Sequence, residues 1–285
     1  MRCVALIAGL AGLAGCDKLF SLETVPQPPI DAPEHCLMAI GHDDDGDCIP
    51  DDVDLCPGVP DPAQGDADHD MIGDACDPDP TKKGNQLLLF VPNTDPVTLA
   101  DWQHNGAWAI INDALANGDT TQGIEDWAYY NHVYAAGLEI QTIVHIDEPG
   151  ELTHNVGLGY AIPPTQGGSP PTADEWSCSV LEDTKGVHLD LFAGGAPSEP
   201  IIPQAMFVAG AVFTLRLRVE ATKISCTIQG ATPAQVQAAT SDPGAVPPMA
   251  QPALYTAQAA GHFDSMAVYS LALAPAVTSS ARSPQ

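Results

Sequence analysis

Two aspartate-rich stretches constrain the fold of this chain more than any other feature. The first follows the spacing D-x-D-x-D-x₃-D-x₂-D with Asp43, Asp45, Asp47, Asp51 and Asp54. The second repeats this spacing 23 residues later with Asp66, Asp68, Asp70, Asp74 and Asp77. Residues 31–79 contain 16 acidic side chains and no lysine or arginine. Because these charges repel one another and few apolar residues accompany them, we expect the segment to fold only around bound cations.

The spacing fits a loop that wraps one calcium ion. Ca²⁺ takes about six to eight oxygen ligands at about 2.3–2.6 Å. Side chains at loop positions 1, 3, 5, 9 and 12 provide carboxylates, and the backbone carbonyl at position 7 falls on Ile49 and Ile72. We therefore predict at least two Ca²⁺ ions, held by the ten aspartates and these two carbonyls. No amphipathic helix flanks either loop, which excludes a helix–loop–helix calcium hand.

The same segment resembles the thrombospondin type-3 repeat. The resemblance is carried by the runs DDDGD at 43–47, DDVDLCP at 51–57 and DADHDMIGDACD at 66–77. It implies a calcium-folded segment braced by cysteine pairs, and it supports a Cys56–Cys76 bridge. The family usually has glycine at loop position 6, where this chain has Cys48 and Met71. We assign residues 36–80 to these repeats and expect them to act as a stiffened stalk.

The N-terminus resembles the signal peptide and lipobox of bacterial lipoproteins. Arg2 precedes an apolar run at 4–13, which is shorter than the roughly 20 residues that span a bilayer. The run ends in LAGC at 13–16, and the resemblance implies cleavage after residue 15 and acylation of Cys16. An ordinary cleaved signal is the alternative. Residues 16–35 are rich in proline and predict an extended linker.

An acylated Cys16 places the protein in the bacterial cell envelope, with the lipid bilayer as a partner. The outer membrane or the cell surface is the favoured location, and the inner membrane facing the periplasm is the alternative. The formal net charge of −28 excludes nucleic acid as a partner, because the phosphates would repel the chain.

Six cysteines remain after the signal peptide and the lipobox, namely Cys36, Cys48, Cys56, Cys76, Cys178 and Cys226. An even number of cysteines in an exported chain indicates disulfides. The sequence alone does not choose among the pairings, but proximity favours 36–48, 56–76 and 178–226. A zinc site in the first four is excluded, because no two of them are spaced as Cys-x₂₋₄-Cys.

Residues 85–274 predict a second, all-β domain. Short apolar runs alternate with turn residues, and we expect strands at 86–91, 127–133, 138–146, 156–162, 176–181, 187–192, 212–220, 223–228 and 263–271. Residues 215–220 alternate apolar and charged side chains, which predicts one buried and one solvated face, and a hairpin turn is expected at Ala221-Thr222. The predicted fold is an antiparallel jelly-roll sandwich preceded by a small irregular, calcium-bound acidic repeat. Residues 275–285 predict a frayed tail.

This domain resembles concanavalin A-like lectin and glucanase domains, including laminin-G-like jelly rolls, through FTLRLRVE at 213–220, ISCTIQG at 224–230 and GHFDSMAVY at 261–269. Related glucanases carry E-x-D-x-x-E on one strand. Here Glu139 is present, but Gln141 and Val144 replace the other two carboxylates, and we predict that the chain is not an enzyme. Asp147, Glu148 and Glu151 follow beside a Pro-Gly turn, and we expect them to be solvated.

These features predict a membrane-anchored, calcium-binding envelope lipoprotein whose jelly-roll domain binds carbohydrate or a surface protein. An extracellular polysaccharide hydrolase and a structural spacer without ligand are the alternatives. The four tryptophans, with Tyr129, Tyr130 and Tyr134, could form a platform for sugar stacking, but burial in or beside the core is the favoured interpretation.

Overall fold

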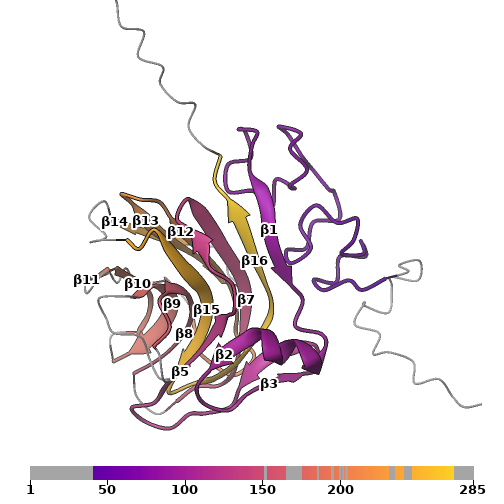
Figure 1. The fold of residues 1–285 in the computed structure, drawn as a ribbon. Helices are drawn as coiled ribbons and strands as arrows, with labels where there is room; N and C mark the ends of the chain where they lie inside the picture. Colours follow the sequence, from indigo (N-terminus) through magenta and orange to yellow (C-terminus); the bar gives the residue numbers. More distant parts are fainter. Residues whose placement is uncertain are drawn as a thin grey trace, which may run out of the picture. The chain divides into compact units, whose positions relative to one another are not determined.

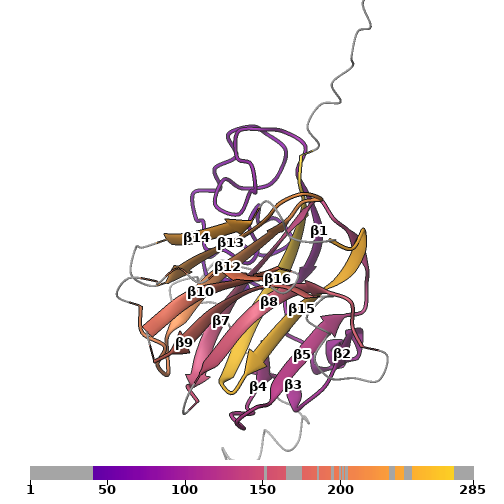
Figure 2. The same cartoon turned by 90° about the vertical axis from the view of Figure 1, so that its left-hand side faces the viewer.

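The computed structural model describes residues 41–150, 153–164, 175–184, 186–193, 196–198, 200, 202, 205–230, 235–240 and 246–272. These residues form two eight-stranded sheets, sheet A and sheet B, which face each other (Figure 1). All of the strand pairs are antiparallel, and the strands of both sheets run in similar directions in Figure 2. The predicted antiparallel jelly-roll sandwich is confirmed.

Sheet A has the order β14-β13-β12-β7-β16-β4-β3, with β1 also paired to β16. Its strands are β1 (Gln86–Val91), β3 (Trp108–Ile111), β4 (Ala114–Asn117), β7 (Leu138–Glu148), β12 (Val212–Val219), β13 (Ile224–Gly230), β14 (Gln235–Thr240) and β16 (Ala260–Ser270).

Sheet B has the order β11-β10-β9-β8-β15-β5-β2, with β6 also paired to β15. Its strands are β2 (Trp102–His104), β5 (Glu125–Tyr130), β6 (Tyr134–Ala135), β8 (His154–Ala161), β9 (Glu175–Asp183), β10 (Gly186–Ala193), β11 (Ala196–Ser198) and β15 (Met249–Ala257). One 3₁₀ helix, η1 (Pro96–Asp101), precedes β2. No helix in the described part of the chain has the length and apolar character that crossing a membrane requires.

The core lies between the two sheets and follows the alternation in the sequence. In β12, Leu215, Leu217 and Val219 are fully buried in this core. Val219 pairs with Ile224 across the turn, which confirms the hairpin at Ala221-Thr222. The faces of β12 are thus distributed as predicted, but the polar face is covered rather than solvated, as described below.

One disulfide joins the two layers of the sandwich. Cys178 lies in β9 of sheet B, Cys226 lies in β13 of sheet A, and their Cα atoms are 5.4 Å apart. The predicted pairs 178–226 and 56–76 are both confirmed. Cys48 is also disulfide-bonded, whereas its predicted partner Cys36 lies outside the described residues, as does Cys16.

The sequence did not predict β15, which is central in sheet B and contains Pro252. On one side of β15, β6 pairs with residues 249–250 and β5 pairs with residues 253–257. Pro252 therefore lies at the gap between two partners, where its missing N–H removes no hydrogen bond on that side. This arrangement explains why a proline is tolerated in a strand with neighbours on both sides.

The β3–β4 hairpin was also missed. Ile111 pairs with Ala114, so the loop consists of Asn112 and Asp113 alone, which have φ of 51° and 60°. Two residues with positive φ are typical of a type I′ hairpin turn, and asparagine and aspartate tolerate this conformation better than most residues.

The disulfide between the sheets gives a stability prediction. Cys178 and Cys226 are 48 residues apart, and closing a loop of this length restricts the unfolded chain by roughly 4 kcal/mol. We expect the double variant C178A/C226A to lose stability of this order in denaturant unfolding. Equal unfolding midpoints and slopes for the variant and the parent would contradict the prediction.

Candidate functional site

The two aspartate stretches form two loops, the first loop at 43–54 and the second loop at 66–77. In the first loop, ligand atoms of Asp43, Asp45 and Asp47 lie within 4.8 Å of one another. In the second loop, Asp66, Asp68 and Asp70 come equally close. The structure thus brings together loop positions 1, 3 and 5 in both repeats, as the spacing predicts.

The backbone of the two loops folds in the same way. In the first loop, Asp43 accepts hydrogen bonds from the N–H groups of Gly46 at 2.9 Å and Cys48 at 3.0 Å. In the second loop, Asp66 accepts equivalent bonds from His69 at 2.7 Å and Met71 at 3.1 Å. In each repeat, the carboxylate at position 1 therefore binds the backbone N–H groups of the residues that follow and curves them into a loop.

The residue at loop position 6 is strained in both repeats. Cys48 has φ of 80° and Met71 has φ of 77°. This left-handed conformation favours glycine, which neither loop has at this position. The chain keeps the backbone shape without glycine, which indicates that other interactions hold the loops in place.

Further carboxylates approach the triplets without joining them. Asp51 and its equivalent Asp74 each accept a hydrogen bond from the N–H at loop position 2, at 2.9 Å in both loops. Asp54 and Asp77, at position 12, each accept one from the N–H two residues later, at 2.7 Å. Ile72 is buried, as expected for an inward-facing side chain at position 7, whereas Ile49 is only half-buried.

Several carboxylate oxygens in the loops are buried without a hydrogen bond. They occur at equivalent positions and include Oδ2 of Asp45, both side-chain oxygens of Asp68, Oδ2 of Asp54 and Oδ2 of Asp77. Burying a charged oxygen without a partner is costly, and a bound cation would remove that cost. These oxygens are the atoms that a metal ion between the triplet and position 12 would contact.

The electrostatics of the loops agree with this interpretation. Burial, together with repulsion by Asp47, raises the pKa of Asp45 to about 7. Burial, together with repulsion by Asp70 and Asp68, raises the pKa of Asp77 to about 6. A divalent cation favours the ionised form of each carboxylate and would reverse both shifts.

The repeat packs against the outer face of sheet A, which is the face directed away from sheet B (Figure 1). Arg216 donates a hydrogen bond to the carbonyl of Ala75. Arg218 donates to the carbonyl of Pro78 at 3.0 Å and forms an ion pair with Asp79 at 2.9 Å. The arginines that we expected to be solvated therefore hold the repeat. The repeat is therefore not the stiffened stalk that we expected, because it packs on the outer face of sheet A.

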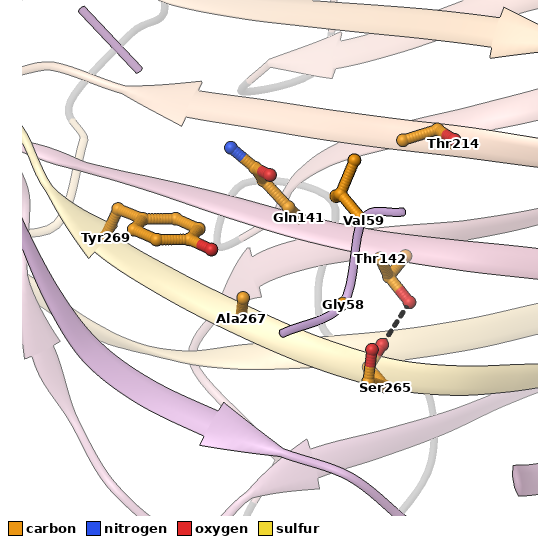
Figure 3. A pocket seen from close by; sticks show the side chains of 8 residues that line it. All are labelled: Gly58, Val59, Gln141, Thr142, Thr214, Ser265, Ala267 and Tyr269. Atoms are coloured by element: carbon orange, nitrogen blue, oxygen red, sulfur yellow. Dashed lines mark hydrogen bonds between the residues drawn. The ribbon is translucent and has the colours of Figure 1, made fainter. Parts of the chain in front are cut away.

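An apolar contact completes the docking. Cys56, Ile72 and Cys76 of the repeat pack against Ala267 and Tyr269 of β16. Figure 3 shows the remaining space beside Gly58 and Val59, which is lined by side chains of β7, β12 and β16. Its volume is about 10 Å³, which is close to the smallest cavity that holds a water molecule, and it therefore has no room for an organic ligand.

Glu139, the remaining carboxylate of the glucanase-like strand, lies under the repeat. It is 6% exposed and accepts a hydrogen bond at 2.8 Å from Gln141, which also donates to the carbonyl of Cys76 at 2.6 Å. Burial raises the pKa of Glu139, and the nearby charge of Arg216 partly offsets this effect. Glu139 supports the docked repeat and is out of reach of a polysaccharide.

The aromatic residues do not form an exposed platform. All four tryptophans are at most 4% exposed, as the favoured interpretation predicted. Trp127 stacks on Tyr255 with ring centroids 4.3 Å apart and on Tyr129 at 5.7 Å, outside the main core. Gly159 makes this packing possible, because a Cβ at that position would approach the Trp127 ring to 2.8 Å.

A cluster that the sequence analysis missed lies on the open part of the outer face of sheet A. His145 of β7 pairs directly with His262 of β16, and their rings stack with centroids 4.5 Å apart. Asp264 lies 2.7 Å from Nε2 of His145, and Asp147 lies 2.8 Å from Nδ1 of His262. Asp147 and Glu148 thus belong to β7 and not to a turn, which corrects our expectation.

A cavity of about 340 Å³ adjoins this cluster. Its lining includes Ala107, Ile111, Asn112, Ala116, Asp147 and His262. Ile111 is 55% exposed beside the amide of Asn112, so the cavity offers an apolar wall together with amide, carboxylate and imidazole groups. This combination suits a ligand with both hydroxyl groups and an apolar face.

Comparisons with known proteins support the fold. No protein-family model matches the sequence, and no curated protein matches it. Among solved structures, peanut lectin with a nine-residue peptide aligns with a TM-score of 0.50 and 7% identity, covering 66% of this chain and 97% of the lectin. The exoplasmic/lumenal domain of VIP36, titled as its Ca²⁺/Man3GlcNAc-bound form, aligns with a TM-score of 0.46 and 11% identity, covering 66% and 91%.

The carbohydrate-binding module CBM66 from Bacillus subtilis aligns with a TM-score of 0.39 and 15% identity, covering 57% of this chain and 92% of the module. The chain therefore has the jelly-roll fold of the legume-type lectins.

The buried Glu139 gives a prediction on pH dependence. Its raised pKa means that the folded state binds the proton more tightly than the unfolded state, whose pKa is near 4.5. The parent therefore gains stability from this group as the pH falls from neutral towards 4.5. We expect E139Q, which keeps the acceptor for Gln141, to be more stable than the parent at pH 7 and to lose this advantage as the pH falls.

The measurement is urea unfolding of both proteins across this pH range at constant calcium concentration. The difference between them isolates Glu139 from the other titrating carboxylates. A difference that stays constant with pH would show that Glu139 titrates alike in the folded and unfolded states.

Proposed function

We propose that this protein is a lipid-anchored, calcium-binding component of the bacterial cell envelope whose jelly-roll domain binds carbohydrate. The observation that carries the proposal is the pair of matching aspartate loops docked on a lectin-type sandwich. In this proposal the calcium loops are a bound part of the domain rather than a spacer in front of it. A purely structural protein without ligand and a polysaccharide hydrolase are the competing functions.

The chemistry of the loops supports calcium in particular. All of the side-chain ligands are carboxylates, which are hard oxygen donors that suit Ca²⁺ and not Zn²⁺ or Cu²⁺. Two triplets of equal geometry support at least two ions. The buried oxygens at position 12 provide each ion with a further ligand.

The sandwich supports carbohydrate as the ligand of the large domain. The fold is that of proteins titled as lectins, one of them peanut lectin at a TM-score of 0.50. The 340 Å³ cavity at the β3–β4 hairpin has room for about one or two sugar rings and offers polar groups around Ile111. Protein ligands remain an alternative for the same surface.

The lipobox supports the location. Acylation of Cys16 would tether the domain to a bilayer through the proline-rich residues 17–35, with more than one acyl chain giving stable anchoring. The net charge of −28 then keeps the folded domain away from anionic lipid headgroups, so that the tether alone holds it. Globomycin treatment of expressing cells, followed by mass spectrometry of the N-terminus, tests this part of the proposal.

Calcium titration calorimetry tests the loops. We expect the parent to bind at least two ions, and D43N/D47N and D66N/D70N each to lose one of them. D52N is the matched control, because Asp52 is an exposed acid of the first loop outside the predicted ligand set. Calcium at 100 times its Kd should stabilise the parent by about 2.7 kcal/mol per site. The same stoichiometry in all four proteins would contradict the assignment.

A glycan array with purified polysaccharides tests the cavity. We expect binding without release of shorter products, and a loss of affinity of roughly tenfold or more in I111R, since an apolar contact is worth about 1–3 kcal/mol. V97R is the matched control, because Val97 is 75% exposed and lies on η1, away from the cavity lining. Product release would support the hydrolase, and neither binding nor turnover would support the structural protein.

A further inference from the structure

The cluster on the open part of the outer face of sheet A has a sequence basis that is independent of the aspartate loops. The motif H-x-D occurs in β7 as His145-Ile146-Asp147 and in β16 as His262-Phe263-Asp264. Alternate residues of a strand point to the same face, so each motif presents an imidazole and a carboxylate on the outer side. Ile146 and Phe263 point the other way and are buried in the core.

A β-bulge helps to place the second carboxylate. The register between β7 and β16 shifts between Phe263 and Met266, both of which face the core. Two residues, Asp264 and Ser265, therefore lie between consecutive core positions of β16. Bulges of this kind redirect side chains and are common next to functional sites.

We propose that His145, His262 and Asp264 bind a Zn²⁺ ion, at a site separate from the calcium loops. One ligand atom from each residue lies within 4.8 Å of the other two. Nε2 of His145 is 2.7 Å from Oδ2 of Asp264, and Nε2 of His262 is 4.0 Å from Oδ1. Both imidazoles can bind one ion only when their rings turn out of the stack, so that each Nε2 and the Asp264 carboxylate lie roughly 2.0–2.2 Å from the Zn²⁺.

Asp147 acts as a positioning residue for this site. Its two carboxylate oxygens lie 2.8 and 2.9 Å from Nδ1 of His262. A carboxylate on Nδ1 fixes the tautomer that leaves Nε2 free to bind metal, as in the carboxylate–histidine–zinc arrangement of many zinc proteins. Two imidazoles and one carboxylate leave a fourth position for water, beside the cavity that His262 lines.

The ligand set distinguishes this site from the two loops. Imidazole nitrogen suits Zn²⁺, whereas Ca²⁺ takes oxygen ligands. The surroundings are negative, because Asp44 of the first loop lies close enough to Asp264 for their charges to repel each other.

The test is a zinc titration of the full chain, purified without a histidine tag, against a chromophoric chelator in excess Ca²⁺. Excess calcium occupies the carboxylate loops, so that they do not compete for zinc. We expect one equivalent of Zn²⁺ to bind, with an affinity reduced roughly 100-fold in H262Q and at least tenfold in D147N. H104Q is the matched control, because His104 is an exposed histidine in sheet B.

Co²⁺ provides a second readout that a general loss of structure would not imitate. The parent should give the visible absorption of tetrahedral Co²⁺, D147N a weakened or shifted spectrum, and H145Q none. Thermal unfolding in calcium alone checks that each variant folds. If a histidine variant does not fold, D264N is tested in its place. Absence of zinc binding by the folded parent, or equal affinity in the parent, H145Q and H262Q, would overturn the proposal.

Discussion

The N-terminal part of the described structure must offset the repulsion among its buried carboxylates. Asp43, Asp47 and Asp77 are at most 7% exposed, and no lysine or arginine occurs between residues 31 and 79. The chain meets part of this demand with backbone N–H groups, which donate to the carboxylates in the same pattern in both loops. It leaves other oxygens buried and unpaired, and in our account calcium binds there.

The same constraint explains the docking of the repeat. A segment with few apolar residues gains little stability by folding alone. Here it shares a small apolar cluster with β16, and Arg216 and Arg218 of β12 contribute positive charge. Arg218 illustrates this role, because it neutralises Asp79 and satisfies the carbonyl of Pro78 at once. The fold of the two loops and the outer face of sheet A are therefore linked by direct contacts.

The outer face of sheet A carries one group of polar residues that the repeat covers and another that stays accessible. Towards one end of β7, Glu139 and Gln141 are covered by the repeat. Towards the other end, His145 and Asp147 remain accessible beside the cavity of the β3–β4 hairpin. The strand β7 thus supports the docked segment at one end, and its exposed polar groups lie further along it.

Much of this arrangement could be predicted from the sequence, because its signals are local. The aspartate spacing predicted that both aspartate triplets come together, and the alternation of residues 215–220 predicted which side of β12 faces the core. Other features depend on pairing between distant segments. Pro252 is compatible with a central strand only because β6 and β5 pair with β15 on either side of it, and the paired H-x-D motifs become a cluster only when β7 and β16 lie side by side.

The most direct test of the account is amide hydrogen exchange of the full chain, followed by mass spectrometry, in calcium and in a calcium chelator. We predict that amides of residues 43–77 are protected in calcium and exchange rapidly in the chelator, while those of β7, β12 and β16 stay protected in both. Equal protection of residues 43–77 in the two conditions would show that this segment folds without metal and would contradict the central claim.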